Sequence, residues 1–227
     1  MNLVRQVLAE ELDYLEPDDP EAIRSRRDLV RINLLMGNAR HIAAALPADM
    51  PARTRTVVDL GSGDGRLMLA IAKRLSIRAA VTLVDREPTV DEATYEGFQR
   101  LAWSVETVKA DALEYLSALE GADLICANLF LHHFQEARLT EVLNLIGHKT
   151  NAFVACEPER SGFAMRCSRL LWAIGCNGVT QRDAVASVRA GFAESELSRL
   201  WPSEADFQLT EHPAGLFSHI FSAVRRG

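Results

Sequence analysis

The chain has 227 residues, of which 48% are hydrophobic and 25% are charged, a composition typical of an ordinary soluble globular protein. Its formal net charge is −6, and the sequence has no basic stripe of the kind that binds nucleic acid. The four cysteines form no CxxC pair and the histidines form no HExxH, so we expect no metal site and no redox dithiol.

The N-terminal sequence MNLVRQVLAEELD carries acidic residues where a signal peptide has an apolar segment. No apolar run approaches the ~18 residues that a membrane span needs. We therefore expect a reduced, cytoplasmic protein that neither inserts into a membrane nor binds nucleic acid. A homodimer is compatible with the sequence.

Residues 1–53 are expected to form a helical extension that acts as a lid. Asp19-Pro20 is typical of an N-cap followed by proline at the first helical position. Residues 22–46 then carry apolar side chains at helical spacing, and Gly37 is expected to break or kink this helix. Residues 47–51 are expected to form a short connector.

From residue 56 the pattern changes to short apolar runs that alternate with amphipathic segments. The runs that predict strands are 57–60, 80–85, 106–110, 124–128 and 152–156. Among the helical segments between them, Thr89 and Glu92 form a capping-box pattern. Such alternation predicts a parallel sheet with helices on both faces, which is a doubly wound α/β fold.

The C-terminal third predicts three helices and then a hairpin. The helices are expected over 161–176, 180–189 and 193–201, and the strands over 207–211 and 216–224. The hairpin adds two antiparallel strands, which gives a mostly parallel sheet of seven. Residues 54–227 are thus expected to form one compact domain, with 161–201 as a helical cover over the carboxyl edge, where such sheets bind ligands.

The most informative segment is VVDLGSGDGRL, in which a strand runs through a glycine-rich turn into a helix. Gly61, Gly63 and Gly65 allow positive φ and let a ligand approach the bare backbone. The G-x-G-x-x-G pattern of nicotinamide-binding proteins fails because its third glycine position is Arg66. The pattern present is D-x-G-x-G-x-G, which begins at Asp59.

That pattern resembles motif I of the class I S-adenosylmethionine-dependent methyltransferases. The resemblance implies a Rossmann-like fold with S-adenosylmethionine as the cofactor. In that family the glycine turn passes the amino-acid half of the cofactor. The residue at the position of Asp59 supports the cofactor's amino group, through water or through the backbone of the turn.

Further candidate cofactor-binding residues follow the next three strands. A carboxylate at Asp85 can accept hydrogen bonds from both ribose hydroxyls, although it is equally a surface acid that can pair with Arg86, itself a candidate for the cofactor site. The resemblance implies that Asp111 contacts the adenine amino group and that the N–H of Ala112 contacts a ring nitrogen. Asp111 is also a candidate N-cap. Asn128 ends the fourth strand and completes the set.

The loop after the fourth strand reads LFLHHF, which differs from the N/D-P-P-aromatic motif of enzymes that methylate planar nitrogens. The acids and Asn of metal-dependent catechol methyltransferases are also not found here. Residues 57–158 are similar to methyltransferases of the ubiquinone/menaquinone-biosynthesis type, and the flanking segments are similar to methyltransferases of aromatic polyketide pathways. The resemblance implies methyl transfer to a small molecule, at a phenolic, quinol-like or polyketide-type aromatic oxygen or carbon.

On this edge His133 is the candidate general base, because a neutral imidazole can accept the proton of a phenol. His132, Arg160 and Glu157 are alternatives on the acceptor side, although the last two can equally form a local ion pair. Two other functions remain open, an NAD(P)-dependent oxidoreductase and a non-catalytic module that binds S-adenosylmethionine. The first conflicts with Arg66 and with the lack of a Tyr-x-x-x-Lys pair.

Overall fold

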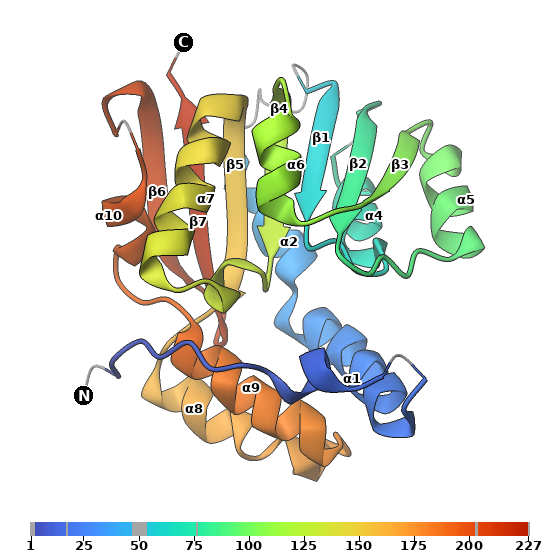
Figure 1. Ribbon diagram of the computed structural model, residues 1–227, viewed down its shortest axis with the longest axis vertical. Coiled ribbons are helices and arrows are strands. Elements are labelled where there is room, and N and C mark those ends of the chain that lie inside the picture. The colour runs from blue at the N-terminus through green and yellow to red at the C-terminus, as the bar shows by residue number, and fades with distance from the viewer. Residues whose placement is uncertain (1–2, 17, 47–53, 76, 203, 227) are drawn as a thin grey trace.

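A computed structural model describes residues 3–16, 18–46, 54–75, 77–202 and 204–226 (Figure 1). Within these residues seven strands form one sheet in the order β3-β2-β1-β4-β5-β7-β6, in which β7 pairs antiparallel with both β5 and β6 and the other neighbouring pairs are parallel. The strands are β1 (Thr56–Leu60), β2 (Ala80–Asp85), β3 (Ser104–Lys109), β4 (Ala122–Asn128), β5 (Thr150–Pro158), β6 (Phe207–Ala214) and β7 (Ser218–Arg225). This arrangement confirms the predicted α/β fold and its closing hairpin.

Helices cover both faces of the sheet and form a further layer beneath one edge. The α-helices are α1 (Pro20–Met36), α2 (Asn38–Ala45), α4 (Arg66–Ala72), α5 (Glu92–Arg100), α6 (Ala112–Ala118), α7 (Glu136–Lys149), α8 (Gly162–Ser168), α9 (Gly178–Ala190) and α10 (Glu196–Leu200). Short 3-10 helices are η1 (Glu11–Tyr14), η2 (Leu131–His133), η3 (Leu171–Ile174) and η4 (Glu204–Asp206). No helix of the described residues is both long and apolar enough to span a bilayer.

The core has two halves, because alternate side chains of each strand point to opposite faces of the sheet. On one face Ile42 of α2, Met68 of α4 and Phe98 of α5 are fully buried against the strands. On the other face Leu116 of α6 and Leu143 of α7 are equally buried. The parallel strands are covered on both sides, which is why they read as nearly continuous apolar runs.

A separate helical layer of α1, α8 and α9 lies beneath the carboxyl ends of the parallel strands (Figure 1). The carboxylate of Asp28 in α1 accepts a hydrogen bond from the backbone N–H of Asn177, just before α9, at 2.9 Å. The chain between the two helical regions turns at Gly37, whose φ of +69° ends α1 and starts α2 as expected. Helix α2 then packs against α4, β5 and β7 rather than in the lower layer.

The N-terminal residues differ from the predicted helix. Residues 3–10 are extended and lie along α9, where the N–H of Gln6 donates to the carbonyl of Arg189 at 3.0 Å. Arg5 donates to the carbonyls of Ala190 and Phe134, at 2.8 and 2.9 Å. These tertiary hydrogen bonds replace those of a local helix, whose formation is cooperative and weak in short segments. The predicted connector over residues 47–51 lies outside the described residues.

Other boundaries shift for local reasons. The N-cap of α5 is Asp91 rather than Thr89, because its carboxylate accepts hydrogen bonds from both the N–H and the hydroxyl of Thr94. The helix expected over 161–176 stops at Ser168, whose hydroxyl bonds back to the carbonyl of Met165. Strand β6 continues through Pro213, which an edge strand tolerates because one side of its backbone needs no N–H donor.

Candidate active site

The glycine turn lies at the carboxyl end of β1, between the sheet and α4. Gly61, Gly63 and Gly65 all have positive φ, of +71°, +54° and +70°. A Cβ at Gly61 would lie 2.6 Å from the ring of Phe130, and one at Gly65 would lie 2.8 Å from Leu83. A Cβ at Gly63 would have no atom within 4 Å, so this glycine alone presents its bare backbone to open space. The open backbone at Gly63 is what a turn needs if a ligand is to approach it closely.

Asp85 lies beside that turn, at the end of β2. Its Oδ2 accepts a hydrogen bond from the N–H of Gly63 at 2.8 Å, and its Oδ1 accepts one from the N–H of Glu87 at 2.8 Å. A carboxylate has about four acceptor positions, so two remain for hydroxyl groups of a ligand. Asp85 thus holds the turn in addition to the ribose role expected from sequence. Arg86 is exposed next to it.

Asp59 is buried at the base of the turn. Burial raises the pKa of its carboxyl, and the nearby carboxylates of Asp85 and Asp64 raise the pKa further, to about 8. The group is therefore largely protonated at neutral pH. A cationic ligand group placed near it would favour the ionised form.

The remaining cofactor candidates follow β3 and β4. Asp111 is the N-cap of α6, and its Oδ1 accepts a hydrogen bond from the N–H of Leu113 at 2.9 Å, which confirms the capping prediction. Ala112 is the first residue of α6 and is buried. Because β3, β2, β1 and β4 are adjacent in the sheet, the residues that follow them gather along one edge.

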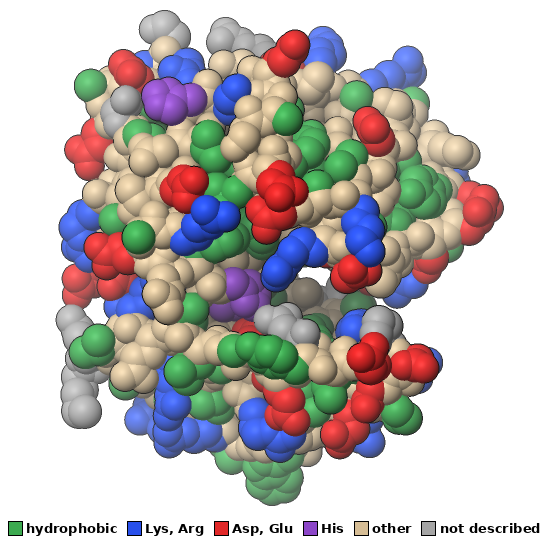
Figure 2. Space-filling model, in the orientation of Figure 1, with side chains coloured by type: hydrophobic (Ala, Val, Ile, Leu, Met, Phe, Trp, Pro, Cys, Tyr) green, Lys and Arg blue, Asp and Glu red, His purple; other side chains and the backbone are tan. Residues whose placement is uncertain are grey.

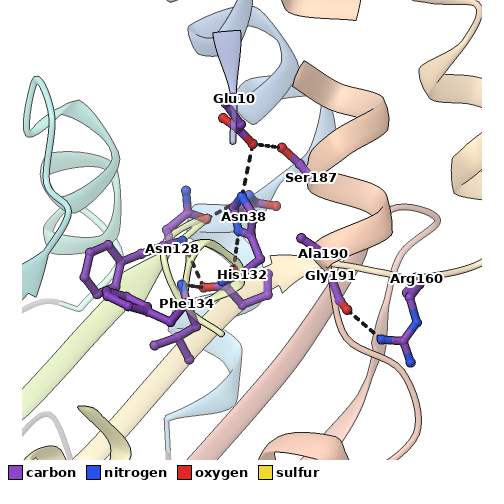
Figure 3. A network of polar contacts seen from close by, with 12 residues as sticks. Glu10, Asn38, Asn128, His132, Phe134, Arg160, Ser187, Ala190 and Gly191 are labelled. Atoms are coloured by element: carbon purple, nitrogen blue, oxygen red, sulfur yellow. Dashed lines mark hydrogen bonds and ion pairs between the residues drawn. The ribbon is translucent and has the colours of Figure 1, made fainter. Parts of the chain in front are cut away.

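Asn128 ends β4 and is fixed by a residue that sequence reasoning missed. Its Oδ1 accepts a hydrogen bond from Nδ2 of Asn38 at 2.8 Å (Figure 3). Oδ1 of Asn38 in turn accepts a hydrogen bond from the hydroxyl of Ser218 at 2.8 Å. These two hydrogen bonds connect α2, β4 and β7. In the sequence Asn38 only follows a turn glycine at the start of a helix, and nothing in that pattern predicts its hydrogen bond with Asn128.

The histidine loop after β4 is held by Glu157 of β5, which is fully buried. Its carboxylate accepts hydrogen bonds from the backbone N–H groups of Phe130 and Leu131, at 3.0 and 2.9 Å, and its Oε2 lies 2.8 Å from Nδ1 of His132. Burial raises the pKa of Glu157, but the hydrogen bonds from His132 and from the backbone outweigh it and lower the pKa. Glu157 is thus a structural anion beneath the loop.

His132 is buried between two carboxylates. Burial lowers the pKa of the imidazole, but Glu10 on one side and Glu157 on the other raise it to about 9. Glu10 comes from the extended N-terminal segment, and its Oε1 lies 3.4 Å from Nε2 of His132 (Figure 3). No sequence pattern predicts this pairing, because Glu10 and His132 lie far apart along the chain.

His133, the candidate base, is not buried. Its ring lies against that of His132, with the centroids 4.2 Å apart. Arg160 forms an ion pair with Glu196 and not with a residue of the histidine loop. The distance from Nη2 of Arg160 to Oε1 of Glu196 is 2.6 Å. The local ion pair expected between Arg160 and Glu157 does not form, because the carboxylate of Glu157 binds His132 and the backbone of the histidine loop.

The site opens into a hollow. Figure 2 shows it between the sheet layer and the helical layer beneath, on the side where the carboxyl ends of the strands point in Figure 1. Residues from the glycine turn and from the loop after β4 therefore border the space between the two layers.

Residues 57–148 match the sequence model of a family described as methyltransferase domain. An uncharacterized methyltransferase of Mycobacterium bovis is 31% identical over 98 residues, which cover 43% of this chain and 47% of that protein. The chain thus matches about half the length of this curated relative.

Solved structures of methyltransferases share the fold. An O-methyltransferase family protein from Burkholderia thailandensis has a TM-score of 0.61 at 17% identity, and the match covers 92% of this chain and 61% of that one. A plantazolicin methyltransferase in complex with SAH has a TM-score of 0.62 at 14% identity, with 92% of each chain covered.

Proposed function

We propose that this chain is an S-adenosylmethionine-dependent methyltransferase that acts on a small molecule. The observation that carries the proposal is the hydrogen bond from the N–H of Gly63 to Asp85, which joins an open glycine turn to an acid at the end of the next strand. The match of residues 57–148 to a methyltransferase family model supports it. A nicotinamide cofactor is disfavoured by Arg66, which occupies the third glycine position and pairs with Asp91.

The cofactor-binding residues have distinct tasks in this proposal. Gly63 allows close approach of the amino-acid half, and Asp85 accepts hydrogen bonds from the ribose hydroxyls. Asp111 and the N–H of Ala112 contact adenine, and Asn128 lies on the side of the transferring methyl group. Arg86 and Asp59 lie next to these contacts. When the carboxyl of Asp59 is ionised, its negative charge favours a nearby ammonium group of the cofactor. When bound, the cofactor supplies an electrophilic methyl group on a sulfonium.

The protein's contribution to methyl transfer is mainly positioning, because the reaction is an in-line displacement that needs two groups aligned. A phenol has a pKa near 10 and is a poor nucleophile until it loses its proton. We assign the acceptor side of the site to His133, which lies on the loop after β4 and is open to solvent. A neutral imidazole there accepts the proton of a hydroxyl group.

The acceptor class proposed is a phenolic, quinol-like or polyketide-type aromatic compound, methylated on oxygen or carbon. The LFLHHF loop, with its similarity to ubiquinone/menaquinone-biosynthesis methyltransferases, supports this choice. The O-methyltransferase name of one structural neighbour is compatible with it. Phe130 and Phe134, whose rings meet edge to face at 5.0 Å, add aromatic surface to the same loop.

The test is direct. Purified protein is incubated with S-adenosylmethionine carrying a labelled methyl group and a panel of phenols, quinols and resorcinols, and transfer is followed by mass spectrometry. Calorimetry with S-adenosylmethionine, its demethylated product and NAD is run in parallel. Cofactor binding with label transfer supports the proposal, while NAD binding without S-adenosylmethionine binding would overturn it.

A further inference from the structure

Three potential metal ligands meet beside the histidine loop. Glu10, His132 and His133 each offer one ligand atom, and these atoms all lie within 4.8 Å of one another. His132 and His133 come from η2, and Glu10, which Figure 3 shows above His132, comes from the extended N-terminal segment. The spacing motifs of metal sites could not show this group, because Glu10 is distant in sequence.

The inner nitrogen of His132 points into this group without a hydrogen-bond partner. Its side chain is only 3% exposed, and Nε2 is a buried polar atom that makes no hydrogen bond among the described residues. The other nitrogen, Nδ1, lies 2.8 Å from the carboxylate of Glu157. With Nδ1–H donating to Glu157, Nε2 faces the carboxylate of Glu10, and either a proton on Nε2 or a metal ion lies between these two atoms.

A proton and a metal ion hold two such atoms at different distances. A charge-assisted N–H···O bond is about 2.7–2.9 Å long, and the Nε2–Oε1 distance is 3.4 Å. Two ligands of a tetrahedral zinc ion, each about 2.0–2.1 Å from the metal, lie about 3.3 Å apart. A shared proton also gives no reason for a third donor, His133, to converge on the same point.

The surroundings have the features of a supported metal site. Ligating histidines commonly donate their second N–H to a carboxylate, and Glu157 occupies that position for His132. The hydroxyl of Ser187 donates to Oε1 of Glu10. Two largely buried carboxylates, Glu10 at 14% and Glu157 at 0% side-chain exposure, balance the charge of a divalent ion.

We propose that Glu10, His132 and His133 bind a divalent transition-metal ion of the zinc class. Imidazole and carboxylate donors suit Zn²⁺, and three protein ligands leave a tetrahedral ion one position for a ligand from outside the chain. Because one ligand comes from the N-terminal segment, the ion also ties that segment to the edge of the candidate active site.

Metal binding stands apart from methyl transfer, although it bears on the role of His133. Coordination would use the imidazole lone pair that a general base needs, so His133 would not act as the base while it held an ion, and a bound ion would supply Lewis-acid chemistry that favours an ionised hydroxyl group. The metal proposal is therefore tested without cofactor or acceptor, so that its outcome does not depend on the methyltransferase proposal.

The experiment is a titration of the chelator-treated, full-length chain with ZnSO₄ by calorimetry, and with CoCl₂ by visible absorption. We expect one ion per chain and the intense bands of tetrahedral Co²⁺. Glu10→Gln, His132→Ala and His133→Ala should each weaken Zn²⁺ binding at least about 100-fold, and Ser187→Ala about tenfold, since it supports a ligand. Exposed His148, in α7, gives the matched control, and His148→Ala should bind Zn²⁺ as the wild type does.

Circular dichroism checks that each variant is folded, and His133→Ala keeps the test valid if the buried His132 variant unfolds, because His133 is not buried. A chain that binds no Zn²⁺ at one equivalent overturns the proposal. So does wild-type affinity in folded Glu10→Gln and His133→Ala.

Discussion

Oδ2 of Asp85 accepts a hydrogen bond from the backbone N–H of Gly63, at a donor–acceptor distance of 2.8 Å. This contact joins two strand ends, β1 and β2, and fixes the one glycine of the turn that faces open space. It makes Asp85 a part of the turn, in addition to the role in cofactor binding that we propose for it.

Asp85→Ala should lose that double role. Removal of a carboxylate that makes two charge-assisted hydrogen bonds to a ligand should weaken S-adenosylmethionine binding by roughly 2–4 kcal/mol. Calorimetry measures the loss. The matched control is Glu87→Gln, an exposed acid two residues along that pairs with Lys109, which should leave cofactor affinity unchanged. Equal effects of the two changes would count against the assignment of Asp85.

Gly63→Ala separates ligand contact from backbone strain. An alanine at φ +54° is strained by about 1–2 kcal/mol, and its Cβ enters the space proposed for the cofactor. Gly175 provides the control, because its φ is +85° and a Cβ there also meets no atom within 4 Å. We expect similar losses of melting temperature in both variants, but loss of S-adenosylmethionine binding only in Gly63→Ala. Retained binding in Gly63→Ala would move the cofactor away from the turn.

Asp59 predicts a pH dependence of stability. Its pKa is about 8 in the folded chain, above the ordinary value of 3.8. Between those values the folded state holds a proton that the unfolded state has lost, so the free energy of unfolding falls as the pH rises through this window. Asp59→Asn removes that fall. In scanning calorimetry, the melting temperature of the variant should therefore rise relative to that of the wild type as the pH increases from 5 to 9. A difference in melting temperature that stays constant with pH would place Asp59 in a more polar environment.

His133→Ala tests the acceptor side of the site. If His133 acts on the acceptor's hydroxyl group, kcat should fall about 10²–10⁴-fold while the affinity for S-adenosylmethionine stays nearly unchanged. An acceptor that is already ionised, or that reacts at carbon, predicts a loss of about tenfold or less, because positioning then dominates. Steady-state kinetics and melting temperatures are measured together. Full activity per folded molecule would remove His133 from the reaction.

Patterns within single segments were enough to predict much of the fold. Alternating apolar runs and amphipathic segments placed the five parallel strands and the closing hairpin, because side-chain periodicity reflects which face of an element is buried. The glycine turn and Asp111 were equally readable, since positive φ and capping depend on a few neighbouring residues. Within the N-terminal extension, the helical prediction was wrong for residues 3–10, because this segment forms hydrogen bonds with α9 and not within itself.

The candidate site divides in the same way. The sequence alone predicted the candidate cofactor residues Gly63, Asp85 and Asp111, which follow successive strands and which the parallel topology brings to one edge. Only the tertiary structure placed Glu10 and Glu157 on either side of His132, and Asn38 against Asn128. Such contacts join segments that are distant along the chain, and their energy comes from burial and charge pairing that exist only after the elements pack. The spacing of residues within one segment therefore does not predict these contacts.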